Sequence, residues 1–341
     1  MSPSTVISRF AAVVLSAWLA LGHAGPAAAY QTFGVKVGNQ VVQVKWSRLP
    51  VRYFVTDRGT AGVTATQFRD AAARALGSWQ GVASASVSAT FAGFTSAEPD
   101  DEDNQNTLGF ASRPDLARVL GSTSYFIDDT TGEILEADIF FNSAFPWSVS
   151  SIGEAGKFDL ESIILHETGH LFGLGHSSLG ETELVAGGGR RVIAAESVMF
   201  PIAFSTGIVK NRTLRADDIA GVSEIYPSQS ASSDTGGLSG RVTKNGQGLF
   251  GAHVVALNPA TGAMVGNFTT DTQGNVTITG LSPGPYIVRV EPVDDAALDS
   301  FFDLSAVPAI DIDFRVTYAQ SFVVVPKGGT SMSFEVKVIP K

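Results

Sequence analysis

Hydrophobic residues early in the chain recur at two different spacings. Val51, Tyr53 and Val55 alternate with other residues, which predicts a half-buried strand. A helix is predicted next, because Thr64 and Gln67 make a capping box and the following apolar residues share one helical face. That predicted face consists of Phe68, Ala71, Ala72, Ala75, Leu76 and Trp79.

Further elements follow from the same reading. Alternation predicts strands over Val87 to Phe91 and Ala137 to Phe141. Asp159 is a good N-cap for a second helix, and a third is expected over Leu214 to Tyr226. The apolar face predicted for this third helix is Ile219, Val222, Ile225 and Tyr226. Strands and helices in mixed order predict an α+β or mixed α/β domain rather than a regular βαβ repeat.

The last third of the chain has a different pattern. Ser228 to Gly237 is small and polar, as in a linker. From Leu238 to Lys341 the sequence is strand-like, with a hairpin signal at Asn245-Gly246, and predicts an antiparallel β-sandwich. We therefore divide the chain into residues 1–29, a first domain (30–227), a linker (228–237) and an all-β C-terminal domain (238–341).

Residues 1–29 resemble a signal peptide. Arg9 supplies the positive end, Phe10 to Leu21 is nearly all apolar, and Ala27 to Ala29 gives a small-residue cleavage pattern. The alternative is a membrane anchor, but the apolar run is short for a bilayer. We expect cleavage near Ala29 and a secreted, extracellular protein without a stable membrane anchor.

Composition narrows the classes of function. The hydrophobic content of 44% is ample for packed cores, and the net charge of −10 argues against a nucleic-acid partner, which requires a basic face. The chain has no cysteine, which excludes disulfides and a cysteine nucleophile. We expect it to act as a monomer.

Three of the histidines lie close together in the sequence. His166 and His170 are one helical turn apart, so both can bind one zinc ion. Gly173 can end the helix in a left-handed conformation and bring His176 back as a third ligand, which leaves one position open. Glu167 then lies beside the metal, where it can act as general base toward a zinc-activated water.

Weaker interpretations of this motif exist. A histidine pair at helical spacing is often incidental, and the site could be structural or degenerate. The extended pattern, with a capped helix, a glycine break and a third histidine, favours catalytic zinc.

These residues resemble the metzincin signature and, more narrowly, that of the matrixins. Ser177 follows the third histidine as in that family, and Ser197 to Pro201 resembles its Met-turn, with Met199 beneath the metal. The resemblance implies that Asp218 braces this turn, that the fold is a twisted sheet with long helices, and that zinc is the cofactor. It also implies that Glu136 to Asn142 is the edge strand that pairs with an extended substrate.

The chain departs from the matrixin pattern in ways that bear on control. Without cysteine the family's cysteine switch cannot operate, so we expect activity once the signal peptide is removed. A long stretch before Met199 includes Gly187 to Gly189 and is expected to form a loop near the substrate pocket.

Calcium is a second candidate cofactor. Asp100, Asp101 and Asp103 cluster in one acidic stretch and could offer carboxylate ligands. A solvated acidic loop is the alternative interpretation.

The C-terminal domain resembles carboxypeptidase-regulatory-like, transthyretin-like sandwiches, through Thr270 to Gly274 and Gly280 to Tyr286. A folding or spacing accessory and an attachment module are both open roles, because the fold does not imply a function.

We therefore expect a secreted zinc metalloendopeptidase acting on protein or peptide substrates. The alternative is a secreted binding or adhesion protein whose metallopeptidase domain is degenerate. Every expected catalytic residue lies in the first domain, so residues 30–227 are expected to cleave peptides alone.

Overall fold

The structure is a computed structural model, and it describes residues 32–37, 40–184, 190–229, 231–293, 298–302, 310–330 and 334–341. The expected signal peptide and the glycines of Gly187 to Gly189 lie outside these residues. No helix in the described part of the chain is long and apolar enough to span a bilayer.

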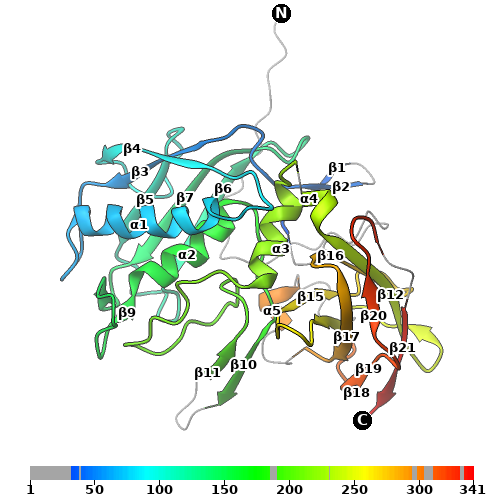
Figure 1. Cartoon of the computed structure of the whole chain (residues 1–341). Helices are drawn as coiled ribbons and strands as arrows, with labels where there is room; N and C mark the ends of the chain where they lie inside the picture. Colours follow the sequence, from blue (N-terminus) through cyan, green and yellow to red (C-terminus); the bar gives the residue numbers. More distant parts are fainter. Residues whose placement is uncertain are drawn as a thin grey trace, which may run out of the picture.

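A five-stranded sheet forms the centre of the first domain, with strand order β4-β3-β5-β7-β6 (Figure 1). Its first four strands run parallel, and β6 runs antiparallel to β7. The strands are β3 (Val51–Thr56), β4 (Ala89–Thr95), β5 (Asn106–Ala111), β6 (Gly121–Ile127) and β7 (Ile134–Asn142).

Two long helices, α1 (Ala65–Gln80) and α2 (Leu160–Leu171), pack against each other and against this sheet. The predicted capping box is confirmed, because Thr64 and Gln67 each accept a hydrogen bond from the other's backbone N–H. The predicted apolar face of α1 is also confirmed, since all six of its residues are buried. Local sequence therefore set both the start and the orientation of α1.

The expectation that Glu136 to Asn142 forms the edge strand is wrong. The segment Glu136 to Asn142 lies in β7, which is paired on both sides, by β5 and by β6. The strand at this edge of the sheet is β6, which pairs antiparallel with the outer side of β7. Its sequence begins Gly121-Ser122-Thr123-Ser124, a polar run with no apolar alternation, so the pattern gave no strand signal.

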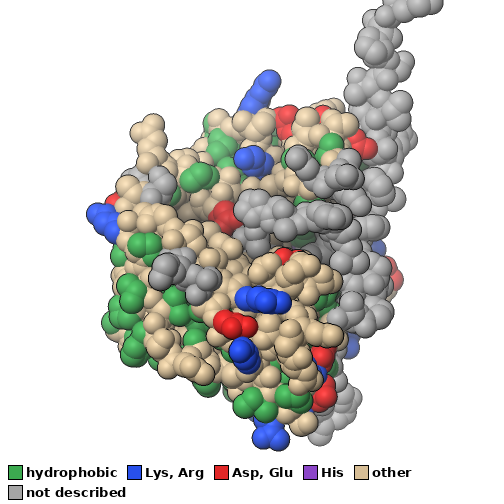
Figure 2. Space-filling view, turned by 90° about the vertical axis from the view of Figure 1, so that its right-hand side faces the viewer, with side chains coloured by type: hydrophobic (Ala, Val, Ile, Leu, Met, Phe, Trp, Pro, Cys, Tyr) green, Lys and Arg blue, Asp and Glu red, His purple; other side chains and the backbone are tan. Residues whose placement is uncertain are grey.

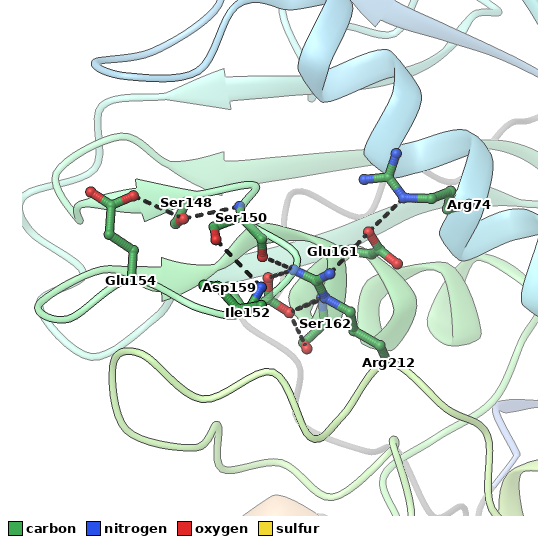
Figure 3. Close-up of polar contacts among 9 residues, drawn as sticks. All are labelled: Arg74, Ser148, Ser150, Ile152, Glu154, Asp159, Glu161, Ser162 and Arg212. Carbon is green, nitrogen blue, oxygen red and sulfur yellow. Dashed lines mark hydrogen bonds and ion pairs between the residues drawn. The ribbon is translucent and has the colours of Figure 1, made fainter.

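The start of α2 is fixed by a polar network (Figure 3). The Asp159 side chain caps the helix by accepting the Ser162 N–H at 3.1 Å. Arg212, from a distant segment, donates its Nε–H to the same carboxylate at 2.8 Å and an Nη2–H to the Ser150 carbonyl at 2.7 Å. Arg74 of α1 binds Glu161 in the first turn of α2, with 2.7 Å between Nε and Oε2. The network ties three parts of the first domain to one helix end.

Smaller elements complete the first domain. Two short pairs, β1 with β2 and β8 with β9, lie outside the main sheet, and a hairpin of β10 and β11 fills the stretch before Met199 where a loop was expected. Their bounds are β1 (Gly34–Val37), β2 (Gln40–Gln43), β8 (Trp147–Ser148), β9 (Phe158–Asp159), β10 (Gly180–Leu184) and β11 (Arg190–Ala195).

The third helix of the first domain is α3 (Ala216–Ile225), and its predicted face is partly wrong. Val222, Ile225 and the adjoining Tyr226 are buried, but the Ile219 side chain is 37% exposed and Ala220 is buried instead. The reason is that α3 packs on the C-terminal domain as well as on its own.

The C-terminal domain consists of two five-stranded sheets, as expected for a sandwich. The expectation of a wholly antiparallel sandwich is wrong, because β12 and β21 run parallel. One sheet contains β12, β13, β16, β18 and β21, and the other contains β14, β15, β17, β19 and β20. Asn245 and Gly246 both have positive φ, 54° and 82°, which confirms the predicted hairpin turn. The strands are β12 (Gly236–Lys244), β13 (Gln247–Gly248), β14 (His253–Leu257), β15 (Met264–Phe268), β16 (Asn275–Leu281), β17 (Gly284–Glu291), β18 (Phe314–Arg315), β19 (Thr317–Tyr318), β20 (Val323–Val325) and β21 (Phe334–Pro340).

Two short helices belong to the second half of the chain. The first, α4 (Ala231–Asp234), lies inside the segment expected to be a linker, and β12 begins at Gly236. The second is α5 (Leu298–Phe301). One continuous cluster of buried apolar residues includes side chains of both domains.

We predict that Arg212→Met lowers the free energy of unfolding by about 3 kcal/mol, because it leaves the Asp159 carboxylate buried without its cation. The two side chains are only 17% and 4% exposed. Urea unfolding measures the change. Arg191→Met is the matched control, since its pair with Glu183 is 62% and 41% exposed and should contribute less than about 1 kcal/mol. Equal, small losses in both variants would contradict this interpretation.

Candidate metal centre

The side chains of His166, His170 and His176 converge on one point. Each offers a ring nitrogen, and these atoms lie within 4.8 Å of one another. The Nε2 atoms of His166 and His170, one turn apart on α2, are 3.1 Å apart. Helix α2 ends at Leu171, and Gly173 follows with a φ of +89° that lets the chain turn back toward His176. A side chain at Gly173 would also meet the Val44 carbonyl, since an added Cβ would lie 2.5 Å from that oxygen.

Each of the three rings has its Nδ1 atom beside a backbone carbonyl. His166 Nδ1 lies 2.8 Å from the Val198 oxygen, and His170 Nδ1 lies 2.7 Å from the Leu174 oxygen. His176 Nδ1 lies 3.1 Å from the oxygen of Ser300, a residue of α5 in the C-terminal domain. A carbonyl can only accept, so each Nδ1 carries the proton and donates it. The Nε2 lone pairs are then free to bind a metal.

Burial also keeps these rings in the ligand form. It lowers the pKa of His166, and it lowers the pKa of His176 to about 3, with a further contribution from His166. The pKa of His170 is lowered well below its usual range by burial and by the neighbouring histidines. Among the described residues, three neutral imidazoles and no fourth protein ligand converge on one point, which is the donor set of a catalytic zinc site. The residues present therefore fit this metal.

Glu167 lies next to this point, and its side chain is buried. Its Oε2 accepts the hydroxyl of Thr123, a residue of β6, at 2.8 Å. Burial raises the pKa of Glu167 to about 7, and the Thr123 hydrogen bond opposes that rise. A carboxyl with a pKa near neutrality can both accept and release a proton at physiological pH.

The turn from Ser197 to Pro201 passes beneath the histidines. Asp218 of α3 accepts hydrogen bonds from the Ser197 hydroxyl at 2.6 Å, from Val198 N–H at 2.9 Å and from Met199 N–H at 3.1 Å. The buried Met199 packs under α2, where a Cβ added to Gly169 would lie 2.3 Å from the methionine sulfur. Asp218 thus holds the turn that presents the Val198 carbonyl to His166.

A cleft of about 560 Å³ opens over the histidines and Glu167. Residues of β6 line it on one side, and Arg190 of the β10–β11 hairpin and the segment after Met199 line it elsewhere. Ser300 of the C-terminal domain also contributes to the lining. The outer face of the C-terminal domain, seen in Figure 2, carries scattered charges of both signs and shows no histidine side chain.

The acidic stretch does not form a comparable centre. Within the described residues, the three histidines are the one group of at least three His, Asp or Glu side chains that converges at ligand distance. The carboxylates of Asp100, Asp101 and Asp103 accept instead from Ser124, from Glu98 N–H and from Gln105. Calcium binding there stays a prediction.

Two buried carboxylates lie beneath this acidic stretch. Glu136 accepts the backbone N–H groups of Asp103 and Asn104. Asp138 accepts the N–H of Thr107 at 2.7 Å and that of Asp100 at 2.9 Å. Burial raises the pKa of Asp138 to about 8, although these two hydrogen bonds oppose the rise.

Several contacts at the centre have no signal in the sequence. Thr123 was not expected because β6 was not, and Ser300 belongs to a segment far along the chain. Asp217, next to Asp218, is also buried, and its Oδ1 accepts the Gly266 N–H from β15 at 2.9 Å. Asp217 lies in the first turn of α3, where acidic residues are common, so nothing in the sequence indicated a special role.

The comparisons with protein families match both halves of the chain. Residues 45–186 match the family described as Matrixin. Residues 237–317 match the carboxypeptidase regulatory-like domain.

Whole-chain comparisons add little to these matches. No curated protein matches the chain. Among solved structures, wild-type OgpA from Akkermansia muciniphila aligns over 73% of this chain and 89% of its own, at 11% identity and a TM-score of 0.25. That likeness is too weak to carry an argument.

We predict that Asp138 makes the protein less stable as the pH rises. An unfolded aspartate ionises near pH 4, whereas Asp138 stays protonated in the fold up to about pH 8. Between these values the folded state binds more protons, so the free energy of unfolding falls with pH by up to about 1.4 kcal/mol per unit.

Urea unfolding at pH 5, 6 and 7 tests this prediction. Asp138→Asn should flatten the slope relative to the wild type, and the same change at the exposed Asp129 should not. Parallel slopes in all three proteins would show that Asp138 does not titrate in this range.

Proposed function

Because this chain joins a matrixin domain to a carboxypeptidase regulatory-like domain, we propose that it is a zinc-dependent endopeptidase with Glu167 as general base. A matrixin domain indicates a metallopeptidase, and a peptidase acts on protein or peptide substrates. The pattern of residues 1–29 supports export of the enzyme.

One observation carries the proposal. Three imidazoles direct unprotonated Nε2 atoms to one point, and a buried carboxyl with a pKa near 7 lies beside that point. A structural zinc site is closed by four protein ligands, whereas the described residues supply three here, beside a cleft. A degenerate domain has no reason to keep both the ligand set and the general base, so the adhesion alternative is not favoured.

His166, His170 and His176 would hold the metal, whose Lewis acidity would activate water and polarise the scissile carbonyl. Glu167 takes the proton that water loses when it attacks the carbonyl carbon. It then passes this proton to the departing amine nitrogen, which could not leave as an anion. Thr123 keeps the carboxylate in place through the bond to Oε2.

The edge strand β6 is proposed to align the substrate. Its free edge borders the cleft, and Gly121, Ser122 and Ser124 line that cleft. An extended peptide can add to such an edge through backbone hydrogen bonds. Because the strand continues past Glu167, it can bind the chain on both sides of the scissile bond, as an endopeptidase requires.

We predict that Glu167→Gln retains one zinc per chain but lowers kcat/KM for peptides by about 10³-fold, because the amide cannot accept the proton. Elemental analysis and a fluorogenic peptide assay measure the two effects. Glu98→Gln is the control, since the Glu98 side chain is 58% exposed and far from the histidines in sequence. Wild-type activity in Glu167→Gln would rule out the proposed mechanism.

We predict a smaller loss for Thr123→Val, an isosteric change that removes the hydroxyl bonded to Glu167. Contacts of this kind around a metal centre contribute about 10- to 100-fold, so kcat/KM should fall within that range. The lost hydrogen bond also raises the pKa of Glu167, which moves the acid limb of the pH profile upward. An unchanged profile would show that Thr123 only packs.

A further inference from the structure

The three histidines differ in where their Nδ1 protons go. His166 donates to Val198 and His170 donates to Leu174, and both acceptors belong to the first domain. The acceptor of His176 is Ser300 in α5, 124 positions further along the chain. We infer that the C-terminal domain completes the metal centre, with the Ser300 carbonyl as the positioning group for the third ligand. This inference rests on the proposed function, since it takes the three histidines as ligands of one zinc ion.

His176 is the ligand that most needs an external partner. His166 and His170 project from α2, whose backbone hydrogen bonds already fix their positions. His176 lies beyond the helix, in residues 175–179, which have no regular secondary structure. A hydrogen bond to Nδ1 fixes the tautomer and the ring orientation of a ligand histidine. Within the described residues, the Ser300 carbonyl is the hydrogen-bond partner found for that nitrogen.

Helix α5 is held in place by the core of the C-terminal domain. Phe301 and Phe302, directly after Ser300, are 2% and 1% exposed. They pack in a separate apolar cluster with Phe250, Phe268 and Val293, and the rings of Phe268 and Phe302 are 4.8 Å apart. The position of the Ser300 carbonyl therefore depends on packing within the second domain.

A second connection joins the domains next to His176. The Ser177 side chain hydrogen-bonds to Asp217, and Asp217 Oδ1 accepts the Gly266 N–H of β15 at 2.9 Å. Helix α3 packs on β15 and β16, and Gly280 approaches Ala220 so closely that an added Cβ would lie 2.9 Å from the Ala220 Cβ. The residue after His176 is thus linked to the C-terminal domain through Asp217 of the first domain.

These contacts give the C-terminal domain a role at the metal centre. The sequence favoured an accessory or an attachment module, and it predicted that residues 30–227 would be active alone. In the structure the accessory supplies the partner of a metal ligand and part of the cleft lining. The first domain by itself keeps all three ligands but loses the group that orients one of them.

The test uses the full chain and removes an apolar contact that holds α5 in the C-terminal domain. Phe302→Ala removes the ring that anchors α5 without touching the histidines or the cleft. Phe314→Ala is the matched control, because Phe314 is fully buried in the same domain but packs in the other apolar cluster. Zinc affinity is measured by competition with a chelator, and the Co²⁺-substituted proteins give a visible spectrum that reports ligand geometry.

We expect Phe302→Ala to weaken zinc binding by about 10- to 100-fold and to alter the Co²⁺ spectrum. Phe314→Ala should lose comparable thermal stability, with zinc affinity within about twofold of wild type and the same spectrum. The inference is overturned if Phe302→Ala binds zinc as the wild type does, or if both variants lose affinity equally.

A measurement on the unmodified protein covers the case in which Phe302→Ala does not fold. In wild-type chain labelled with ¹⁵N-histidine, the His176 Nδ1 proton should exchange slowly with water, because the Ser300 carbonyl accepts it. Exchange as fast as that of a solvent-exposed imidazole N–H overturns the inference. None of these readouts requires peptide cleavage. A protein that binds zinc in this way but cleaves no peptide would refute the proposed function alone.

Discussion

A buried imidazole that must present an unprotonated nitrogen to a metal needs an acceptor for the proton on its other nitrogen. Three such rings lie together here, and burial in the absence of acceptors would be costly for each N–H group. The acceptors are three backbone carbonyls, those of Val198, Leu174 and Ser300. Carbonyls do not titrate, so they hold the same tautomers for as long as the rings are neutral. Much of the surrounding structure serves to hold these three carbonyls in place.

Each carbonyl is held in a different way. Leu174 follows the glycine turn at the end of α2, so its position is local to the ligand motif. Val198 belongs to the turn that Asp218 fixes through three hydrogen bonds, which makes α3 a support of the centre. Ser300 depends on aromatic packing in the C-terminal domain. The Leu174 carbonyl thus depends on one turn, the Val198 carbonyl on the first domain, and the Ser300 carbonyl on the packing of both domains.

Two buried carboxyl groups near the sheet have different roles because their hydrogen-bond partners differ. Glu167 and Asp138 both have raised pKa values because both are buried. Glu167 faces the cleft and has a single side-chain donor, Thr123, so its oxygens remain available for proton transfer. Each carboxylate oxygen of Asp138 accepts a hydrogen bond from a backbone N–H group, one from Thr107 and one from Asp100. These bonds tie a loop to the sheet. The first fits a reaction and the second fits a structural role.

The sequence alone determined the features that depend on neighbours within a few residues. The capping box and buried face of α1, the start of α2 at Asp159, and the hairpin at Asn245-Gly246 all follow from local backbone and side-chain preferences. The spacing of His166 and His170 belongs here too, because helix geometry brings residues four apart onto one face.

Only the tertiary structure decided the features that depend on which surfaces meet. Strand β6 lies at the edge because it pairs with β7 alone, and a polar strand of this kind has no hydrophobic alternation to reveal it. Ile219 turned outward because α3 packs against a second domain near Ala220. The partnership of His176 with Ser300 spans 124 positions and uses a backbone atom that every residue possesses. No pattern of residue types can encode such a contact, so it became visible only when the two domains were packed together.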